Sequence, residues 1–317
     1  MMDQDRQAET PPDRIGPSPA LAGAYAHCEA LLRDHDKDRF LADLFIPAKT
    51  RPHAHALQAF SLEIARIRDM VSEPMPGELR QQWWRDALAG GARGEAAANP
   101  VAAALGDTLD RFGLASAPLE ALIDARGFDL YDDPMPDMAT LESYCRETSS
   151  VLFRLVADML EAGASEASLT AAAPMDAGRA ALGGSPPLLA EAAGHAGLAY
   201  AFTGLIRAFA LHAAQGRVYL PGDLLQRYGS SREEVLAGRA TPALLSAIGD
   251  WRSQARRHLA AASAAIARLS QASRPPFLPL ALVEPYLRRT EMRDYDPFHT
   301  PVELPQWRRQ WILWRGK

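Results

Sequence analysis

The feature that most constrains the fold is the recurrence of apolar residues at helical spacing along nearly the whole sequence of 317 residues. No run of alternating Val, Ile or Thr bounded by turn residues occurs, so a β-sheet is not expected. Because 48% of the residues are hydrophobic, the chain can bury a sizeable core. We therefore predict an all-α fold class. The predicted helices span Ala20–Asp34, Arg51–Ser72, Pro76–Ala89, Pro100–Phe112, Ala117–Arg126, Thr140–Ala162, Pro187–Ala214, Thr241–Ala272 and Leu304–Arg315.

The breaks between these helices are short segments rich in Gly and Pro, such as Gly183–Pro187 and Ser273–Pro276, which are typical of loops rather than domain linkers. We predict one domain over residues 20–317 and a disordered tail over residues 1–19. The tail is rich in Asp, Gln and Pro and has no apolar stretch, which is unlike a secretory signal or a transit peptide. We therefore predict a cytoplasmic location.

Charge and cysteine content exclude several classes of protein. The formal net charge of −5 gives no reason to expect nucleic acid as a partner, since phosphate binding needs a concentrated positive field. Cys28 and Cys145 are too few for a disulfide framework, and we interpret both as buried thiols. The longest apolar stretch, Gly197–Ala214, contains Arg207 and is interpreted as a core helix rather than a membrane span. That helix could instead line a cavity for a lipid-like ligand.

Two acidic residues, Asp69 and Glu73, stand four apart in a predicted helix, which would place both carboxylates on one helix face. Such a pair can bind magnesium, which favours one or two carboxylates together with water and substrate phosphates. The alternative is a solvated acidic face that pairs with neighbouring arginines.

The surrounding sequence is more specific than this pair. Over most of its length the chain resembles the squalene/phytoene synthase family. The first aspartate-rich motif of that family, Arg-x-x-Asp-x-x-x-Asp, matches Arg66, Asp69 and Glu73, with a conservative change at its second acidic position. The resemblance implies an isoprenoid synthase-type helical bundle around a central cavity. Further matching segments are Arg39–Leu41, Ile46–Pro47, Ala56–Phe60, Gly77–Arg85, Phe128–Leu130 and Tyr144–Arg146.

The second aspartate-rich motif has lost its acids. In active members of the family this segment resembles Thr-Asn-Ile-Leu-Arg-Asp-x-x-x-Asp followed by Gly-Arg-x-Tyr-Leu-Pro. Here the two aspartate positions are Ala208 and His212, and the Asn position is Gly204. No Asp or Glu occurs between Glu191 and Asp223, so a shifted alignment cannot restore them. The flanking matches are Thr203, Arg207, Gly216, Arg217, Tyr219, Leu220 and Pro221.

The resemblance implies a site for prenyl diphosphates, which family enzymes join head to head after magnesium-assisted departure of diphosphate. Asp69 and Glu73 would hold only half of the metal clamp, and the imidazole of His212 is a poor ligand for magnesium. We therefore expect no cofactor, or magnesium if the chain is active. The substrate-binding candidates are Arg66, Arg207, Arg217 and Tyr219. The complete vestigial site would comprise Arg66, Asp69, Glu73, Arg207, Ala208, His212 and Tyr219.

The C-terminal helix carries Trp307, Trp311 and Trp314 at positions i, i+4 and i+7, with Arg308 and Arg309 beside them. This face is predicted to bind a membrane surface or a partner protein; the alternative is that the tryptophans pack into the core. The preceding Asp294–His299 string, Asp-Tyr-Asp-Pro-Phe-His, resembles the branch of the family associated with assembly of the NADH:ubiquinone oxidoreductase, respiratory complex I.

Three functions follow from these patterns. The first is a non-catalytic family member that acts in complex I assembly, with complex I subunits or assembly intermediates as partners, or as a membrane-proximal scaffold at the inner membrane. The second is a magnesium-dependent prenyl diphosphate transferase with an altered metal site. The third is a prenyl-lipid binding protein without chemistry. We favour the first, because Ala208 and His212 replace the metal ligands.

Overall fold

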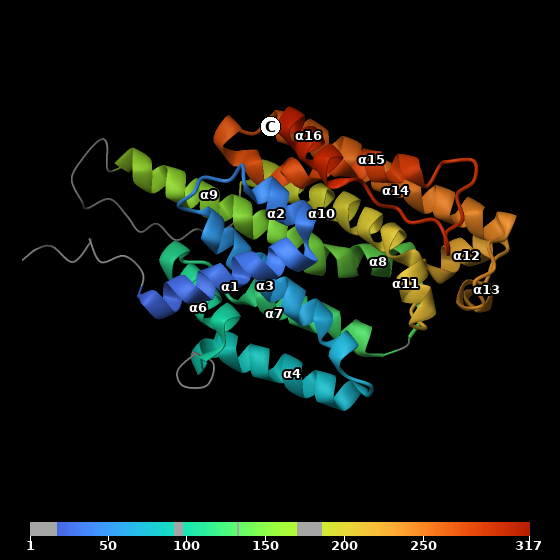
Figure 1. Cartoon of the computed structure of the whole chain (residues 1–317), viewed down its shortest axis with the longest axis horizontal. Coiled ribbons are helices and arrows are strands. Elements are labelled where there is room, and N and C mark those ends of the chain that lie inside the picture. Colours follow the sequence, from blue (N-terminus) through green and yellow to red (C-terminus); the bar gives the residue numbers. More distant parts are fainter. Residues whose placement is uncertain (1–17, 92–97, 132, 170–185) are drawn as a thin grey trace, which may run out of the picture.

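A computed structural model describes residues 18–91, 98–131, 133–169 and 186–317. Every regular element in these ranges is helical, and no strand occurs in them, which confirms the all-α prediction (Figure 1). Most of the predicted tail lies outside the described residues. The helices are α1 Pro19–His35, α2 Lys37–Asp43, α3 Arg51–Arg66, α4 Pro74–Asp86, α6 Pro100–Phe112, α7 Ala117–Arg126, α8 Met138–Cys145, α9 Val151–Leu169, α10 Pro187–Arg207, α11 Phe209–Ala214, α12 Gly222–Tyr228, α13 Arg232–Leu236, α14 Pro242–Ala267, α15 Val283–Arg289 and α16 Gln306–Gly316.

Shorter 3-10 or π segments continue several of these helices. They are η2 Arg68–Met70, η3 Ala87–Gly91, η4 Gly127–Leu130, η5 Arg146–Ser150, η6 Gln271–Ser273 and η7 Pro275–Leu282. Sequence periodicity missed α2, α12, α13 and α15, because helices of five to seven residues span at most two turns.

Local chemistry fixes several helix ends. The Asn99 side chain accepts a hydrogen bond from the backbone N–H of Ala102 at the start of α6, and Pro100 occupies the first turn. Gly113 ends the same helix in the left-handed region, with φ of 61°. The Thr241 hydroxyl caps α14 in the same way by accepting from Leu244 N–H. The predicted bounds of α6 and α7 therefore agree with the structure.

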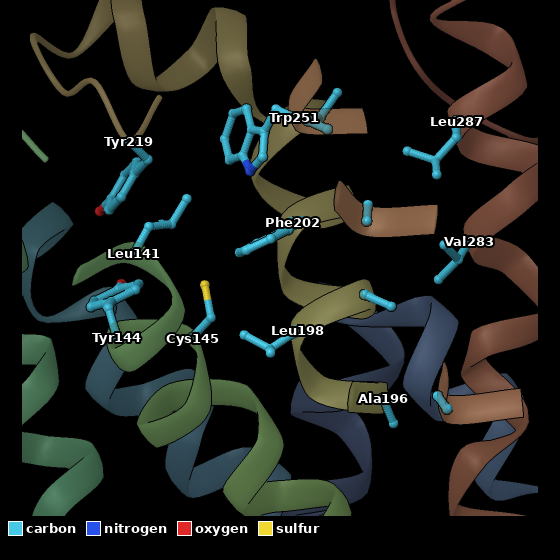
Figure 2. Close-up of a cluster of buried hydrophobic side chains, with 14 of the residues drawn as sticks. Leu141, Tyr144, Cys145, Ala196, Leu198, Phe202, Tyr219, Trp251, Val283 and Leu287 are labelled. Atoms are coloured by element: carbon cyan, nitrogen blue, oxygen red, sulfur yellow. The ribbon is translucent and has the colours of Figure 1, made fainter. Parts of the chain in front are cut away.

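The largest core cluster is centred on α10, which packs along α14 and also contacts α8, α9 and α15. Phe202 and Trp251 are fully buried there. At Gly197 the backbone of α10 approaches Ser150 so closely that a Cβ would lie 2.2 Å from its atoms, so this contact requires glycine. Figure 2 shows Tyr144 and Tyr219 on one side of this cluster and Val283 and Leu287 on the other.

Two further clusters complete the buried interior. One is formed mainly by α1, α3, α6, α7 and α9. The other joins α2 near the N-terminus to η7, α15 and α16 at the C-terminus, with Leu282, Tyr286 and Leu313 almost completely buried. Figure 1 shows α16 at one edge of the molecule and α4 at the opposite edge.

Candidate functional site

The first acidic motif does not have the predicted helical geometry. Helix α3 ends at Arg66, Asp69 lies in the short segment η2, and Val71 and Glu73 adopt extended backbone conformations. The prediction that Asp69 and Glu73 share a helix face is therefore wrong. The physical reason is Pro74, because a proline disfavours helical geometry in the residue before it. Arg66 is half-buried at the end of α3, whereas Glu73 is exposed.

Asp69 faces an arginine of the second motif region. The carboxylate of Asp69 lies 3.0 Å from Nη2 of Arg217, whose side chain is largely buried and also contacts Gln215. Gly216 makes the turn that brings Arg217 there, with φ of 79°. The structure thus places a fixed positive charge beside the first-motif carboxylate.

Behind Arg217 lies a buried polar network of Arg126, Asp129, Tyr144 and Tyr219. The Asp129 carboxylate accepts hydrogen bonds from the Tyr219 hydroxyl at 2.7 Å, the Tyr144 hydroxyl at 2.9 Å and Nη1 of Arg126 at 2.9 Å. Burial, and then the nearby negative charge of Asp129, raises the pKa of the Tyr219 hydroxyl. Burial also raises the pKa of the Tyr144 hydroxyl, so both tyrosines remain neutral donors to Asp129 at physiological pH.

His212 packs on this network. Its ring centroid lies 4.8 Å from that of Tyr219. Burial, with a smaller contribution from the positive charge of Arg217, lowers the pKa of His212 to about 4, so the imidazole is neutral at pH 7. The cavity beside Asp129, Arg217 and Tyr219 has a volume of only about 10 Å³, enough for about one water molecule.

These residues do not fit a two-motif magnesium site. In the described ranges no three His, Cys, Asp or Glu side chains are grouped closely enough to hold a metal ion. Asp69 is paired with Arg217, and Glu73 lies on extended backbone in solvent. The second motif region offers only the neutral ring of His212 as a donor.

Arg207 lies on the other side of the break between α10 and α11, where Ala208 leaves helical geometry. Its guanidinium contacts the Asp38 carboxylate at 2.9 Å and that of Glu303 at 3.1 Å, and it lies 3.7 Å from the ring centroid of Tyr286. Arg207 is therefore engaged by protein groups rather than placed beside Asp69. A polar pocket of about 440 Å³ adjoins it, lined by residues of α1, α2, α10, η7, α15 and α16 and by Glu303.

Asp38 is the centre of this second cluster. Its carboxylate also accepts a hydrogen bond from the Tyr286 hydroxyl at 2.8 Å and pairs with Arg309 of α16 at 3.1 Å. Sequence reasoning did not single out Asp38, Asp129, Arg126 or Tyr144 as site residues. The only available signal was that Phe128–Leu130 and Tyr144–Arg146 match the family, because the partners are too far apart in sequence for spacing to reveal their contacts.

The C-terminal tryptophans are on the surface. Trp307, Trp311 and Trp314 are 69%, 53% and 52% exposed, which contradicts the alternative that they are core residues. Arg308 is also exposed, whereas Arg309 is half-buried against Asp38.

The family model described as squalene/phytoene synthase matches residues 32–315. The chain belongs to the squalene/phytoene synthase family. Among its relatives is "NADH dehydrogenase (ubiquinone) complex I, assembly factor 6" of Rattus norvegicus, 29% identical over 286 residues that cover 90% of this chain and 79% of the relative.

More distant relatives include synthases. Chloroplastic phytoene synthase 3 of Zea mays is 26% identical, over 92% of this chain and 66% of that protein. Among solved structures, a dehydrosqualene synthase in complex with a ligand superimposes with a TM-score of 0.75 at 16% identity, covering 93% of this chain and 96% of the other. This likeness confirms the isoprenoid synthase-type fold.

The described residues include no helix suited to span a membrane. None of their helices combines the length and apolarity that crossing a bilayer requires.

Proposed function

We propose that this family member is non-catalytic and acts in the assembly of respiratory complex I, as a peripheral protein on the cytoplasmic side of the inner membrane. The observation that carries the proposal is the replacement of the second motif's acids by Ala208 and His212, together with the pairing of Asp69 to Arg217. Relatives from Rattus norvegicus and Homo sapiens that are named as complex I assembly factor 6 support the assembly role.

An active synthase must first expel diphosphate from its prenyl substrate. This step requires cations that neutralise the developing negative charge, and magnesium held between two acidic motifs supplies them in an active synthase. Here one motif lacks carboxylates, and Asp69 of the other is paired with Arg217. The cavity bordered by Asp129, Arg217 and Tyr219, of about 10 Å³, is itself too small for a diphosphate group.

The two alternatives have weaker support. The transferase alternative depends on Asp69 and Glu73, which lie on a 3-10 segment and on extended backbone rather than on one helix face. Prenyl-lipid binding would need an apolar cavity, and the pocket of about 440 Å³ beside Arg207 does not fit one, because it is lined by charged groups that include Asp34, Asp38 and Arg207.

A deletion strain tests the assembly role. We expect loss of the chain to lower assembled complex I and NADH:ubiquinone oxidoreductase activity in membranes, and the wild-type gene to restore both. An Asp69→Ala variant should restore them equally well, because the proposal assigns no catalysis to that carboxylate. Normal complex I levels in the deletion strain would reject the assembly role, and failure of Asp69→Ala despite normal protein levels would reject the non-catalytic mechanism.

A further inference from the structure

We propose that the outer face of α16 is a docking surface for anionic lipid bilayers. This surface, here called the tryptophan face, consists of Trp307, Trp311 and Trp314 on α16 and Leu44 just after α2. The inference rests on the peripheral location proposed above but not on the role in complex I assembly.

The tryptophan face is apolar and is not used for packing. More than half of each Trp side chain is exposed, and Leu44 is 46% exposed. The opposite side of α16 makes the contacts with the body of the protein, through fully buried Leu313. Three large apolar side chains clustered on one helix face represent an exposed patch of the kind that marks an interaction site.

A groove extends the patch beyond α16. Its volume is about 470 Å³, and it runs between α16 and the end of α2, with predominantly apolar lining. The rings of Trp311 and Trp314 stack on each other with centroids 5.4 Å apart, and Phe45 contributes to the same groove. The apolar surface is therefore continuous across two helices that are remote in sequence.

Basic side chains surround this apolar surface. The ammonium of Lys317 lies 5.3 Å from the Trp314 ring and 5.8 Å from the Phe45 ring, and the guanidinium of Arg315 lies 6.0 Å from the Trp311 ring. Arg308 is also exposed on α16. No Asp or Glu occurs after Glu303, although the whole chain has a net charge of −5.

An exposed apolar patch with basic side chains around it is suited to an anionic bilayer. An acidic protein would be repelled from an anionic bilayer unless its basic groups were gathered at the point of contact, as they are here. Tryptophan prefers the headgroup region, where its apolar ring and its polar N–H are both accommodated. Protein–protein interfaces are also enriched in Trp and Arg, so the aromatic residues alone do not distinguish the two occupants. We assign the face to anionic lipid because the positive charges around it have no acidic residue among the positions after Glu303.

Contacts within the protein fix the orientation of the tryptophan face before it binds a bilayer. Arg309 pairs with Asp38 at 3.1 Å and donates to the backbone carbonyl of Leu304 at 2.9 Å. These contacts fix α16 on the body with the tryptophans outward. The helix therefore need not fold on the bilayer, which lowers the entropic cost of binding.

The test is co-sedimentation of the purified full-length chain with phosphatidylcholine vesicles, with and without phosphatidylglycerol. We expect binding to the anionic vesicles, accompanied by a blue shift of tryptophan fluorescence. Trp311→Ala/Trp314→Ala should weaken binding about tenfold or more, because two interfacial rings are lost. The matched control is Met75→Ala/Leu79→Ala, which removes two exposed apolar side chains from α4 at the opposite edge and should leave binding unchanged.

A second variant tests how much the basic side chains contribute to vesicle binding. Arg308→Gln/Arg315→Gln/Lys317→Gln should weaken binding to anionic vesicles by about fivefold per removed charge and reduce its salt dependence. The control Arg80→Gln/Arg239→Gln/Arg257→Gln removes the same charge from exposed positions elsewhere and should have a smaller effect.

Three results would overturn the inference: no vesicle binding by the wild-type chain, equal binding of the tryptophan variant, or a wild-type dimer that the tryptophan substitutions convert to a monomer. The last result, measured by light scattering, would assign the face to a second copy of the chain. Because these assays use pure protein and lipid, their outcome is independent of complex I levels. Unchanged circular dichroism of each variant confirms that it is folded.

Discussion

The site predicted from the two motifs and the tryptophan face differ in how their side chains are satisfied. Around Asp129 the polar groups are buried and bind one another, and the adjacent cavity has room for only about one water molecule. On α16 large apolar groups are exposed with basic groups around them. A region whose groups already satisfy one another has little free energy to gain from a ligand, whereas an exposed apolar patch gains by being covered. The comparison places the binding capacity of this protein on its surface.

The largest loss of stability is expected from substitution of Asp129, the centre of the buried polar network. We expect Asp129→Ala to lower the free energy of unfolding by about 3 to 5 kcal/mol, because it leaves the Arg126 charge and the hydroxyls of Tyr144 and Tyr219 buried without their acceptor. Urea unfolding measures this. The exposed Asp110→Ala is the control and should change stability little. A loss below about 1 kcal/mol for Asp129→Ala would show that the network is not structural.

The next largest effect is expected at Asp38, which links Arg207 of α10 to Arg309 of α16. Asp38→Ala removes the shared partner of Arg207, Arg309 and Tyr286, and we expect a loss of about 2 to 3 kcal/mol of stability. It should also increase hydrogen exchange in α16, because Arg309 loses its ion pair. Unchanged exchange in α16 would contradict the idea that Asp38 fixes the orientation of the tryptophan face.

A pH titration tests the burial of His212. Its folded-state pKa of about 4 lies below the ordinary value of 6.5, so the unfolded chain takes up the proton first as the pH falls. The stability contribution of neutral His212 is complete above pH 6.5 and is lost progressively toward pH 4, amounting to about 2 kcal/mol between pH 7.5 and pH 5.

His212→Gln should therefore reduce the loss of stability over that pH range, as measured by urea unfolding at each pH. The exposed His27→Gln is the matched control and should not alter the slope. Equal slopes for the wild type and His212→Gln would mean that His212 is solvated.

The smallest change in stability is expected at Asp69, the aspartate retained from the first motif. Asp69→Ala should change stability by less than about 0.5 kcal/mol, because the Asp69 side chain is 51% exposed and its pair with Arg217 is screened by solvent. Thermal unfolding at low and high salt measures this difference. If Asp69→Ala lowered the free energy of unfolding by several kcal/mol, Asp69 would belong to the buried network around Asp129. That result would contradict the comparison between this network and the tryptophan face.

Much of this fold could be predicted, because the long helices have strong apolar periodicity and clear ends, as in α6 and α7. The prediction for Asp69 and Glu73 was wrong because it continued the helix beyond Arg66, where α3 ends. Pro74 was the signal in the sequence that Glu73 adopts an extended backbone conformation. The Asp38 and Asp129 clusters could not be predicted from spacing. Asp38 and Arg309 are 271 positions apart, and only the packed bundle brings them together. The tryptophan spacing identified a common helix face, but its exposure required the structure.

The most direct test of the central claim is diphosphate release from farnesyl and geranylgeranyl diphosphate by the purified chain, with magnesium or manganese. Asp69→Ala serves as the control, since its folding should be unaffected. We predict no release above that control. Metal-dependent release that disappears in Asp69→Ala would contradict the account and make this chain a prenyl transferase with an altered second metal site.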